Sequence, residues 1–288
     1  MARRATYTGP DGPEVPLPRG DVTEAVVRVG DTVRRPHQPG SDAVARYLDH
    51  LERVGFDRAP RYLGRDRQGR DVLDFLAGAV PGARLPGWAV TDDVLAAVAR
   101  LTRDLVAAGA GWLPGPEVRF PRDIVATPPV PLPAGEPLVV AHGDVTPQNV
   151  VFRDGAPWGV VDFDLAGRTT ELTELANTAM HWVPLLDPAD ADPAFRAGGD
   201  VTVEDDGRRI ARRLRVFLDA YGLPTARREA FLDAAALRFT GLPATMRWRA
   251  EHLGGGWARM WEAGVGDVLT RRVEWFTAVR ADLAAALA

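Results

Sequence analysis

Three polar side chains that can do chemistry stand at fixed intervals in one stretch of the sequence: Asp144, Asn149 and Asp162. A loop between two buried strands needs turn-forming residues, but it does not need an acid and an amide at a set spacing. One carboxylate can orient and deprotonate a hydroxyl group. An amide oxygen and a second carboxylate are hard oxygen ligands, which can hold Mg²⁺ on nucleotide phosphates. The pattern therefore indicates a site aimed at a ligand.

The elements around these residues predict that they lie close together. Apolar runs typical of buried strands end just before Asp144, begin just after Asn149 and end just before Asp162. Between the last two runs lies Asp154-Gly155, a strong signal for a hairpin turn. We expect this hairpin to bring Asn149 and Asp162 to the same edge, next to the loop that carries Asp144.

The N-terminal part of the chain predicts a small lobe rich in β-structure. Short β-prone segments follow one another between residues 13 and 36, and two more lie at 61–66 and 71–78. Between them, residues 41–54 have the spacing of an amphipathic helix. The apolar face of this helix consists of Val44, Tyr47, Leu48, Leu51 and Val54.

A larger, mostly helical lobe is expected to follow. A break rich in Gly and Pro at 77–88 marks the boundary, which predicts lobes at 1–80 and 81–288. Thr91 has the character of a helix N-cap, and from about residue 171 the pattern is helical with polar breaks. The chain is thus expected to be an α+β protein with two lobes.

Protein kinases show the same order of acid, amide and acid, with the same interval of five between the first two. Here His-Gly-Asp at 142–144 replaces His-Arg-Asp, and Asp-Phe-Asp at 162–164 replaces Asp-Phe-Gly. There is also no activation segment ending in Ala-Pro-Glu. With these differences, HGDVTPQN followed by GVVDFD resembles the catalytic loop and metal strand of the aminoglycoside phosphotransferase family. The resemblance covers nearly the whole chain and implies a two-lobed protein-kinase-like fold.

The resemblance also implies roles for the three residues. Asp144 would be the base that orients the acceptor hydroxyl, and Asn149 and Asp162 would hold Mg²⁺ on ATP. The acceptor would be a hydroxyl of a small molecule. Acceleration would come mainly from positioning and from neutralisation of charge.

Three neighbours of the site are expected to have supporting roles. His142 is expected to hydrogen-bond the loop and to take no part in the chemistry. Asp164 is expected to cap the helix that follows it, in preference to approaching a second metal ion. Glu174 resembles an acid of the family that supports the catalytic loop.

The nucleotide side departs from the family pattern, which places a Lys on the third strand. All 35 basic residues of this chain are Arg, so an Arg must act there or the site must do without. If Val33 packs on the adenine, Arg35 points the same way, towards the phosphates, and Arg34 faces outwards. Glu52 is a weak candidate for the helix acid that usually pairs with the Lys.

Two further segments are expected to contact the nucleotide. A loop over the phosphates would consist of Gly20, Asp21, Val22 and Thr23. The backbone that meets the adenine edge, at the hinge between the lobes, would belong to Asp74, Phe75 and Leu76.

Composition narrows the class of protein. The net charge of −4 argues against a dedicated nucleic-acid binder, which is usually basic. No apolar run approaches the roughly 20 residues that span a bilayer. The absence of cysteine excludes disulfides and thiolate chemistry. We expect a cytoplasmic protein that acts on a small molecule, without nucleic-acid or membrane partners, and the sequence does not indicate its oligomeric state.

The acceptor is expected not to be a polycationic aminoglycoside, because acidic and basic residues are nearly balanced after residue 170. Trp182 is a candidate for the wall of the acceptor pocket. Two alternatives to a kinase of this kind stay open. One is a pseudokinase that binds a nucleotide or an antibiotic without turnover, and the other is a kinase for an amino alcohol such as choline.

Overall fold

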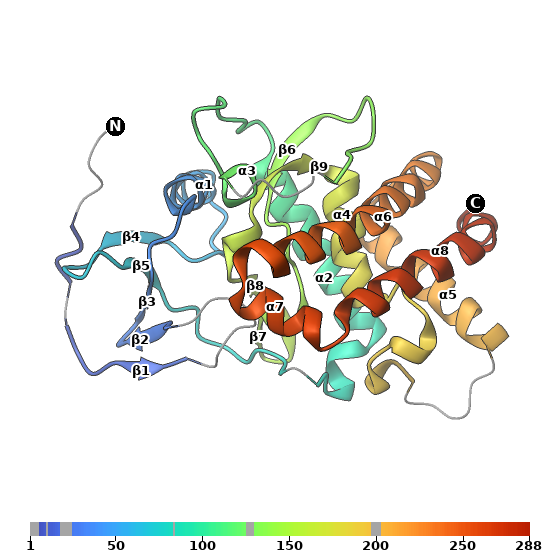
Figure 1. Ribbon diagram of the computed structural model, residues 1–288, viewed down its shortest axis with the longest axis horizontal. Coiled ribbons are helices and arrows are strands. Elements are labelled where there is room, and N and C mark those ends of the chain that lie inside the picture. The colour runs from blue at the N-terminus through green and yellow to red at the C-terminus, as the bar shows by residue number, and fades with distance from the viewer. Residues whose placement is uncertain (1–5, 10, 18–24, 83, 125–129, 197–202) are drawn as a thin grey trace.

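A five-stranded antiparallel sheet and one helix form the smaller, N-terminal part of the protein (Figure 1, blue). The structure is a computed structural model, and it describes residues 6–9, 11–17, 25–82, 84–124, 130–196 and 203–288. The sheet has the order β1-β2-β3-β5-β4. Its elements are β1 (Val15–Pro16), β2 (Val27–Val29), β3 (Thr32–Arg35), helix α1 (Ser41–Arg53), β4 (Tyr62–Arg65) and β5 (Asp71–Asp74).

Helix α1 forms where the amphipathic pattern predicts it and turns its apolar face to the core. Tyr47, Leu48 and Leu51 are buried. Val54, which was expected on the same face, is 51% exposed, because it follows the last helical residue as the C-cap. The Tyr47 hydroxyl donates to the carbonyl of Val140 at 3.0 Å, which ties the helix to the strand that precedes the loop of Asp144.

The larger part is mostly helical, with two short two-stranded sheets near its junction with the small part (Figure 1). Thr91 caps its first long helix as predicted, since the Thr91 hydroxyl accepts from the amide of Val94 at 3.3 Å. The helices are α2 (Asp92–Gly109), α3 (Pro121–Ile124), α4 (Glu171–Trp182), α5 (Val203–Tyr221), α6 (Arg228–Leu253), α7 (Gly255–Glu262) and α8 (Val265–Leu287). The sheets pair β6 (Leu138–Ala141) with β9 (Gly167–Thr170) and β7 (Val150–Arg153) with β8 (Ala156–Val160).

The hairpin of β7 and β8 has the predicted turn. Asp154 and Gly155 both have positive φ angles, of 50° and 78°, which suits a tight hairpin connection. The amide of Val161 donates to the carbonyl of Asn149 at 2.9 Å, beyond the last residue pair of the ladder. The register therefore places Asn149 and Asp162 at one end of the hairpin, as the sequence predicts.

The two parts meet where the chain leaves β5. Ala79 exchanges backbone hydrogen bonds of 2.9 and 2.7 Å with Phe152, so the connecting segment is already attached to the large part at this point. The last strand of the sheet ends at Asp74. A lobe boundary at residue 80 lies just after this attachment and stays a prediction.

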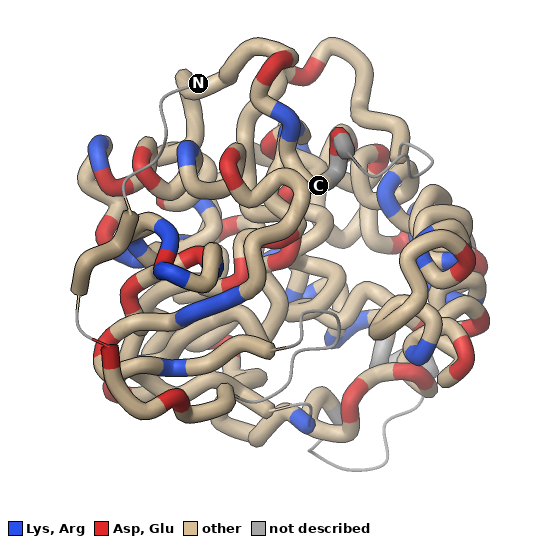
Figure 2. The backbone as a smooth tube through the Cα atoms, turned by 60° about the vertical axis from the view of Figure 1, so that its left-hand side comes forward, with Lys and Arg blue, Asp and Glu red and all other residues tan. Residues whose placement is uncertain are grey.

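Acidic and basic residues are interspersed along the chain. In the view of Figure 2, blue and red segments alternate over the elements that face the viewer. Of the helices in the described ranges, none is long and apolar enough to cross a membrane. Because the charges are interspersed, a charged site would have to be formed by a local group of residues.

Candidate active site

Asp144 and Asn149 are held together in the loop between β6 and β7. The amide nitrogen of Asn149 donates to the carboxylate of Asp144 at 2.8 Å and to the backbone carbonyl of Asp144 at 3.0 Å. Asn149 is buried, whereas Asp144 is half-buried. These two bonds use the nitrogen of the Asn149 amide, which leaves its oxygen, Oδ1, as the atom that can bind a cation.

His142 supports this loop from inside, as predicted. The Nε2 atom of His142 lies 2.9 Å from the carbonyl of Val161, and its Nδ1 atom accepts from the amide of Asp144 at 3.1 Å. The ring packs against Phe163, with 4.3 Å between the ring centroids. The imidazole therefore links the loop of Asp144 to the segment that carries Asp162.

Helix α4 supplies two more supports for the loop. The buried carboxylate of Glu174 accepts from the amide of Gly143, with both oxygens at 3.0 Å, which fits the supporting role expected for this acid. Asn177, one turn later, donates to the carbonyl of Gly143 at 2.6 Å and was not singled out from the sequence. Its position one turn after Glu174 on the same helix face is the signal that could have found it.

Trp182 corrects one expectation. The side chain is 1% exposed, and its indole N–H donates to the carbonyl of Val145 at 2.8 Å. A buried indole needs such a partner. Trp182 therefore lies in the core beneath the loop of Asp144 and is not the wall of an open pocket.

Asp162 and Asp164 bring two carboxylates to the end of β8. Asp162 has a φ angle of 63°, a left-handed conformation that Asp and Asn tolerate better than most residues. Burial and the nearby carboxylate of Asp164 raise the pKa of Asp162 to about 6, although Arg35 acts in the opposite direction. Two carboxylates this close repel each other when both are ionised, and a bound cation relieves that repulsion.

Arg35 of β3 supplies a cation to these carboxylates in the structure. Its guanidinium contacts the carboxylate of Asp164 and lies 3.4 Å from that of Asp162. Burial alone would lower the pKa of Arg35, but the two carboxylates raise it. Arg35 therefore points into the site, as the strand alternation predicts, and Asp164 pairs with it. The expectation that Asp164 caps the next helix is wrong, because the hydroxyl of Thr170 caps α4.

The neighbouring residue Arg34 differs from its expected position. It is 1% exposed, and its guanidinium stacks over the ring of Tyr7 at 4.5 Å from the centroid. The alternation of β3 does place Arg34 opposite Arg35, but the N-terminal segment covers that face. Arg34 is thus a buried residue of the small lobe and does not face solvent.

Of the other residues expected to act at the nucleotide, the structure describes some and not others. Val33 shares the cleft-facing side of β3 with Arg35 and is half-buried. Glu52 is exposed on α1, whereas the carboxylates that contact Arg35 belong to Asp162 and Asp164. Gly20, Asp21, Val22 and Thr23 lie outside the described residues.

The hinge segment follows β5. The amide of Phe75 donates to the carbonyl of Asp31 at 2.9 Å, and the Phe75 ring carries the guanidinium of Arg28 at 3.9 Å. The carboxylate of Asp74 accepts from Arg61 Nε at 2.8 Å. Leu76 is half-buried between the strand and the large lobe. The contacts of these residues with a nucleotide stay a prediction.

The donor set fits Mg²⁺. Mg²⁺ is usually held by one or two carboxylates, with phosphate oxygens and water completing its shell. Asp162 offers a carboxylate and Asn149 a free amide oxygen, and both lie beside the loop that carries Asp144. Among the described residues there is no cluster of three His, Cys, Asp or Glu side chains that could hold a metal alone. The arrangement therefore suits a metal that arrives with phosphates.

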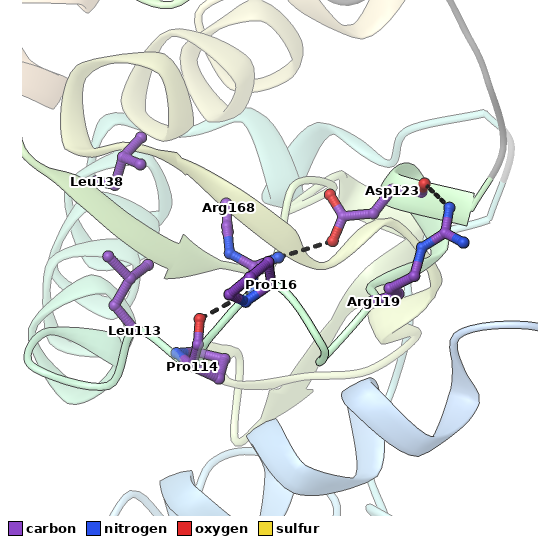
Figure 3. A pocket seen from close by; sticks show the side chains of 7 residues that line it. All are labelled: Leu113, Pro114, Pro116, Arg119, Asp123, Leu138 and Arg168. Atoms are coloured by element: carbon purple, nitrogen blue, oxygen red, sulfur yellow. Dashed lines mark hydrogen bonds and ion pairs between the residues drawn. The ribbon is translucent and has the colours of Figure 1, made fainter.

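A surface cavity of about 430 Å³ lies beside β6, β9 and α3, and none of the predicted site residues lines it (Figure 3). Its charged groups bind one another. Arg168 donates to Asp123 at 2.8 Å and also to the carbonyls of Pro114 and Gly115. Since these polar groups are satisfied within the protein, the cavity adds no residue to the candidate site.

Comparison with known proteins agrees with this geometry. The model of the phosphotransferase enzyme family matches residues 42–217. The trifolitoxin immunity protein of Rhizobium leguminosarum bv. trifolii is 34% identical over 213 residues, which cover 72% of this chain and 74% of that protein.

Two solved structures share the fold over nearly the whole length. A choline/ethanolamine kinase family protein from Mesorhizobium loti has a TM-score of 0.55 at 17% identity, covering 98% of this chain and 93% of that one. A choline kinase from Cryptosporidium parvum Iowa II has a TM-score of 0.56 at 9% identity, covering 94% and 90%. The chain therefore belongs to the phosphotransferase enzyme family and has the protein-kinase-like fold, with a small sheet lobe and a larger helical lobe.

Proposed function

We propose that the protein is an ATP- and Mg²⁺-dependent kinase that transfers a phosphoryl group to a hydroxyl of a small molecule. The observation that carries this proposal is the bond between Asn149 and Asp144, at one end of the hairpin whose other strand leads to Asp162. A base and two metal-binding oxygens thus share one small region. Arg35 reaches the same region from the opposite lobe.

The residues divide the chemistry among them. Asp144 would accept the proton of the acceptor hydroxyl while that oxygen forms its bond to the γ-phosphorus. The bond from the γ-phosphorus to the bridging oxygen breaks, and ADP leaves with that oxygen. Arg35 would move from the carboxylates to the nucleotide phosphates, where a guanidinium can bind two oxygens at once.

Asn149 and Asp162 would hold Mg²⁺, which when bound neutralises charge on the phosphates. Asn149 could do this without releasing Asp144, because its nitrogen donates to Asp144 and its oxygen would remain available to the metal. This amide therefore couples the position of the base to the position of the metal. Most of the rate acceleration would come from this preorganised arrangement.

A binding module without turnover is the main competing function. The missing Lys favours it, and the presence of Asp144, Asn149 and Asp162 favours the enzyme. The relative named as a trifolitoxin immunity protein is compatible with either, since a toxin can be bound or modified. An amino-alcohol kinase is a third reading, which shares the chemistry and differs in the acceptor.

A coupled ADP-release assay with a library of small hydroxyl compounds tests the proposal. We expect Mg²⁺-dependent ADP formation that rises with at least one compound and is lost in Asp144→Asn. ATP binding without ADP formation, at any acceptor, would instead support the binding module. A cytoplasmic location is proposed with the enzyme, because ATP is supplied there.

A further inference from the structure

Three basic side chains lie on helices of which α6 packs on both of the others, and the chemistry described so far uses none of them. They are Arg238 of α6, His181 of α4 and Arg272 of α8. Arg238 donates from Nε at 3.1 Å and from Nη2 at 3.0 Å to the side-chain oxygen of Asn177. The same Asn177 binds the carbonyl of Gly143, next to Asp144. The guanidinium of Arg238 is therefore two hydrogen bonds away from the catalytic loop.

His181 lies one turn after Asn177, on the same face of α4. Burial and the positive charges of Arg272 and Arg238 lower the pKa of His181 to about 3, so the ring is neutral. It is half-buried, and within the described residues its ring nitrogens have no hydrogen-bond partner. A neutral imidazole in this position can donate or accept one hydrogen bond from a ligand.

Arg272 is the most informative member of the group. It is 7% exposed, and its Nε atom donates to the carbonyl of Leu185 at 3.1 Å. Among the described residues, neither a carboxylate nor a carbonyl accepts from its two terminal nitrogens. The acid whose charge raises the pKa of Arg272, Asp190, is already bound to Arg271 at 2.6 and 2.8 Å. A buried cation without a paired anion is costly for a folded protein.

Arg213 shows what a structural arginine in the same lobe looks like. Burial lowers the pKa of both Arg213 and Arg272 to about 10. However, the terminal nitrogens of Arg213 donate to the carbonyls of Val90 and Trp182, each at 2.8 Å, and Asp92 lies 3.6 Å away. Its charge and its terminal nitrogens are used within the protein. Among the described residues, the terminal nitrogens of Arg272 meet neither a carboxylate nor a carbonyl, and its guanidinium lies 5.8 Å from the centre of the Phe239 ring.

We propose that Arg272, Arg238 and His181 form the subsite for an anionic group of the acceptor. The substrate would then be a small hydroxyl compound that carries a carboxylate or a phosphate, held with its hydroxyl at Asp144 and its anionic group among helices α4, α6 and α8. This inference rests on the proposed kinase function and names its substrate class. A cationic acceptor would meet two guanidinium groups there, which disfavours choline-like and aminoglycoside-like compounds.

Direct binding to the full-length protein tests the subsite without turnover. Calorimetric titration would use glycerate and glycerol 3-phosphate as anionic probes, glycerol as the neutral probe, and choline and kanamycin as cationic probes. At least one anion should bind at least about tenfold more tightly than the other classes, since charge-assisted bonds to Arg are strong. Which of the two anions binds better distinguishes a carboxylate from a phosphate acceptor.

Variants separate this role from a purely structural one. Arg272→Met should weaken binding of the anionic probe by about tenfold or more while leaving the melting temperature unchanged or higher, because it removes an unpaired buried charge. Arg213→Met, the matched control, should lower the melting temperature and leave anion affinity unchanged. Arg238→Gln, at a half-buried position, gives a second measure of anion affinity in case Arg272→Met does not fold.

The proposal is overturned if neither anion binds, if glycerol or choline binds as tightly, or if anion affinity survives in both Arg272→Met and Arg238→Gln. These outcomes are distinct from failure of the kinase assignment. Mg²⁺-dependent ATP binding, measured in parallel, reports on the kinase assignment alone. A protein that phosphorylates a neutral or cationic acceptor would keep the proposed function and lose only this subsite.

Discussion

The guanidinium of Arg35, in the small lobe, contacts the carboxylate of Asp164, in the large lobe, and also lies 3.4 Å from Asp162. One arginine thus bridges the two lobes across the place where nucleotide and metal are proposed to bind. Without a nucleotide, this ion pair neutralises the carboxylates. Binding must exchange it for two new pairs, in which Arg35 meets phosphates and the carboxylates meet a metal.

This exchange predicts opposite effects of Arg35→Ala on two ligands. Affinity for ATP with Mg²⁺ should fall by about tenfold or more, because a charge-assisted contact to phosphate is lost. Affinity for Mg²⁺ alone should rise, because the metal no longer competes with a guanidinium for Asp162 and Asp164. Calorimetry with each ligand measures both effects. Arg35→Lys is the control and should keep most of the ATP affinity, since it retains the charge, and a loss equal to that of Arg35→Ala would count against the phosphate role.

Arg34→Ala should act on stability and not on the nucleotide. Arg34 is 1% exposed and stacks on Tyr7, so its removal leaves a cavity in the small lobe. We expect a loss of about 2 kcal/mol or more in the free energy of unfolding, as for other large-to-small changes at buried positions. Chemical denaturation measures this quantity. If unfolding is unchanged and ATP affinity drops instead, the assigned phases of Arg34 and Arg35 on β3 are wrong.

Trp182→Phe tests the structural role of the buried indole. Phe keeps an aromatic ring at this position, but the carbonyl of Val145 loses the hydrogen bond that it accepts from the indole N–H at 2.8 Å. A buried carbonyl left without its donor costs about 1–3 kcal/mol of stability. Thermal and denaturant unfolding would show this cost. Unchanged stability, combined with an altered choice of acceptor, would restore Trp182 to the acceptor pocket.

Local patterns were sufficient to predict that Asp144, Asn149 and Asp162 lie close together. The spacing from Asn149 to Asp162 is set by one hairpin, and the direction of Arg35 follows from strand alternation, so both could be read without the fold. Which residues become buried, in contrast, depends on contacts with segments that are far away in the chain. Arg34 is buried by Tyr7, and Trp182 lies under a loop that begins about forty residues earlier.

Ion pairing, like burial, depends on segments that are far apart in the sequence. The sequence shows that basic and acidic residues balance in the helical lobe, but not which of them pair. Asp164 was expected to cap a helix because it precedes one, and it pairs with Arg35 of the other lobe instead. Arg272 and Arg238 come from helices α8 and α6, so only the packing of α6 on α4 and of α8 on α6 brings them near His181.

Asp144→Asn should separate chemistry from nucleotide binding. The amide can still accept from Asn149 through its oxygen, so the loop should keep its shape. It cannot take a proton from the acceptor, and we expect kcat to fall by about 10²–10⁴-fold with little change in ATP affinity. Steady-state kinetics on the best acceptor, with ATP binding measured separately, would show the split. A kcat within a few-fold of the parent would mean that another group is the base.

Asp162 is the position at which to ask whether Asp144, Asn149 and Asp162 form one metal-dependent phosphoryl-transfer site. Asn keeps the size of the side chain and tolerates the left-handed backbone at this position, where φ is 63°, so Asp162→Asn should fold normally. The measurement is ATP binding by calorimetry with Mg²⁺ and with a chelator, in the parent and in Asp162→Asn. We expect Mg²⁺ to strengthen ATP binding in the parent and to have no such effect in the variant, which should also form no ADP. Equal strengthening by Mg²⁺ in both proteins would contradict it.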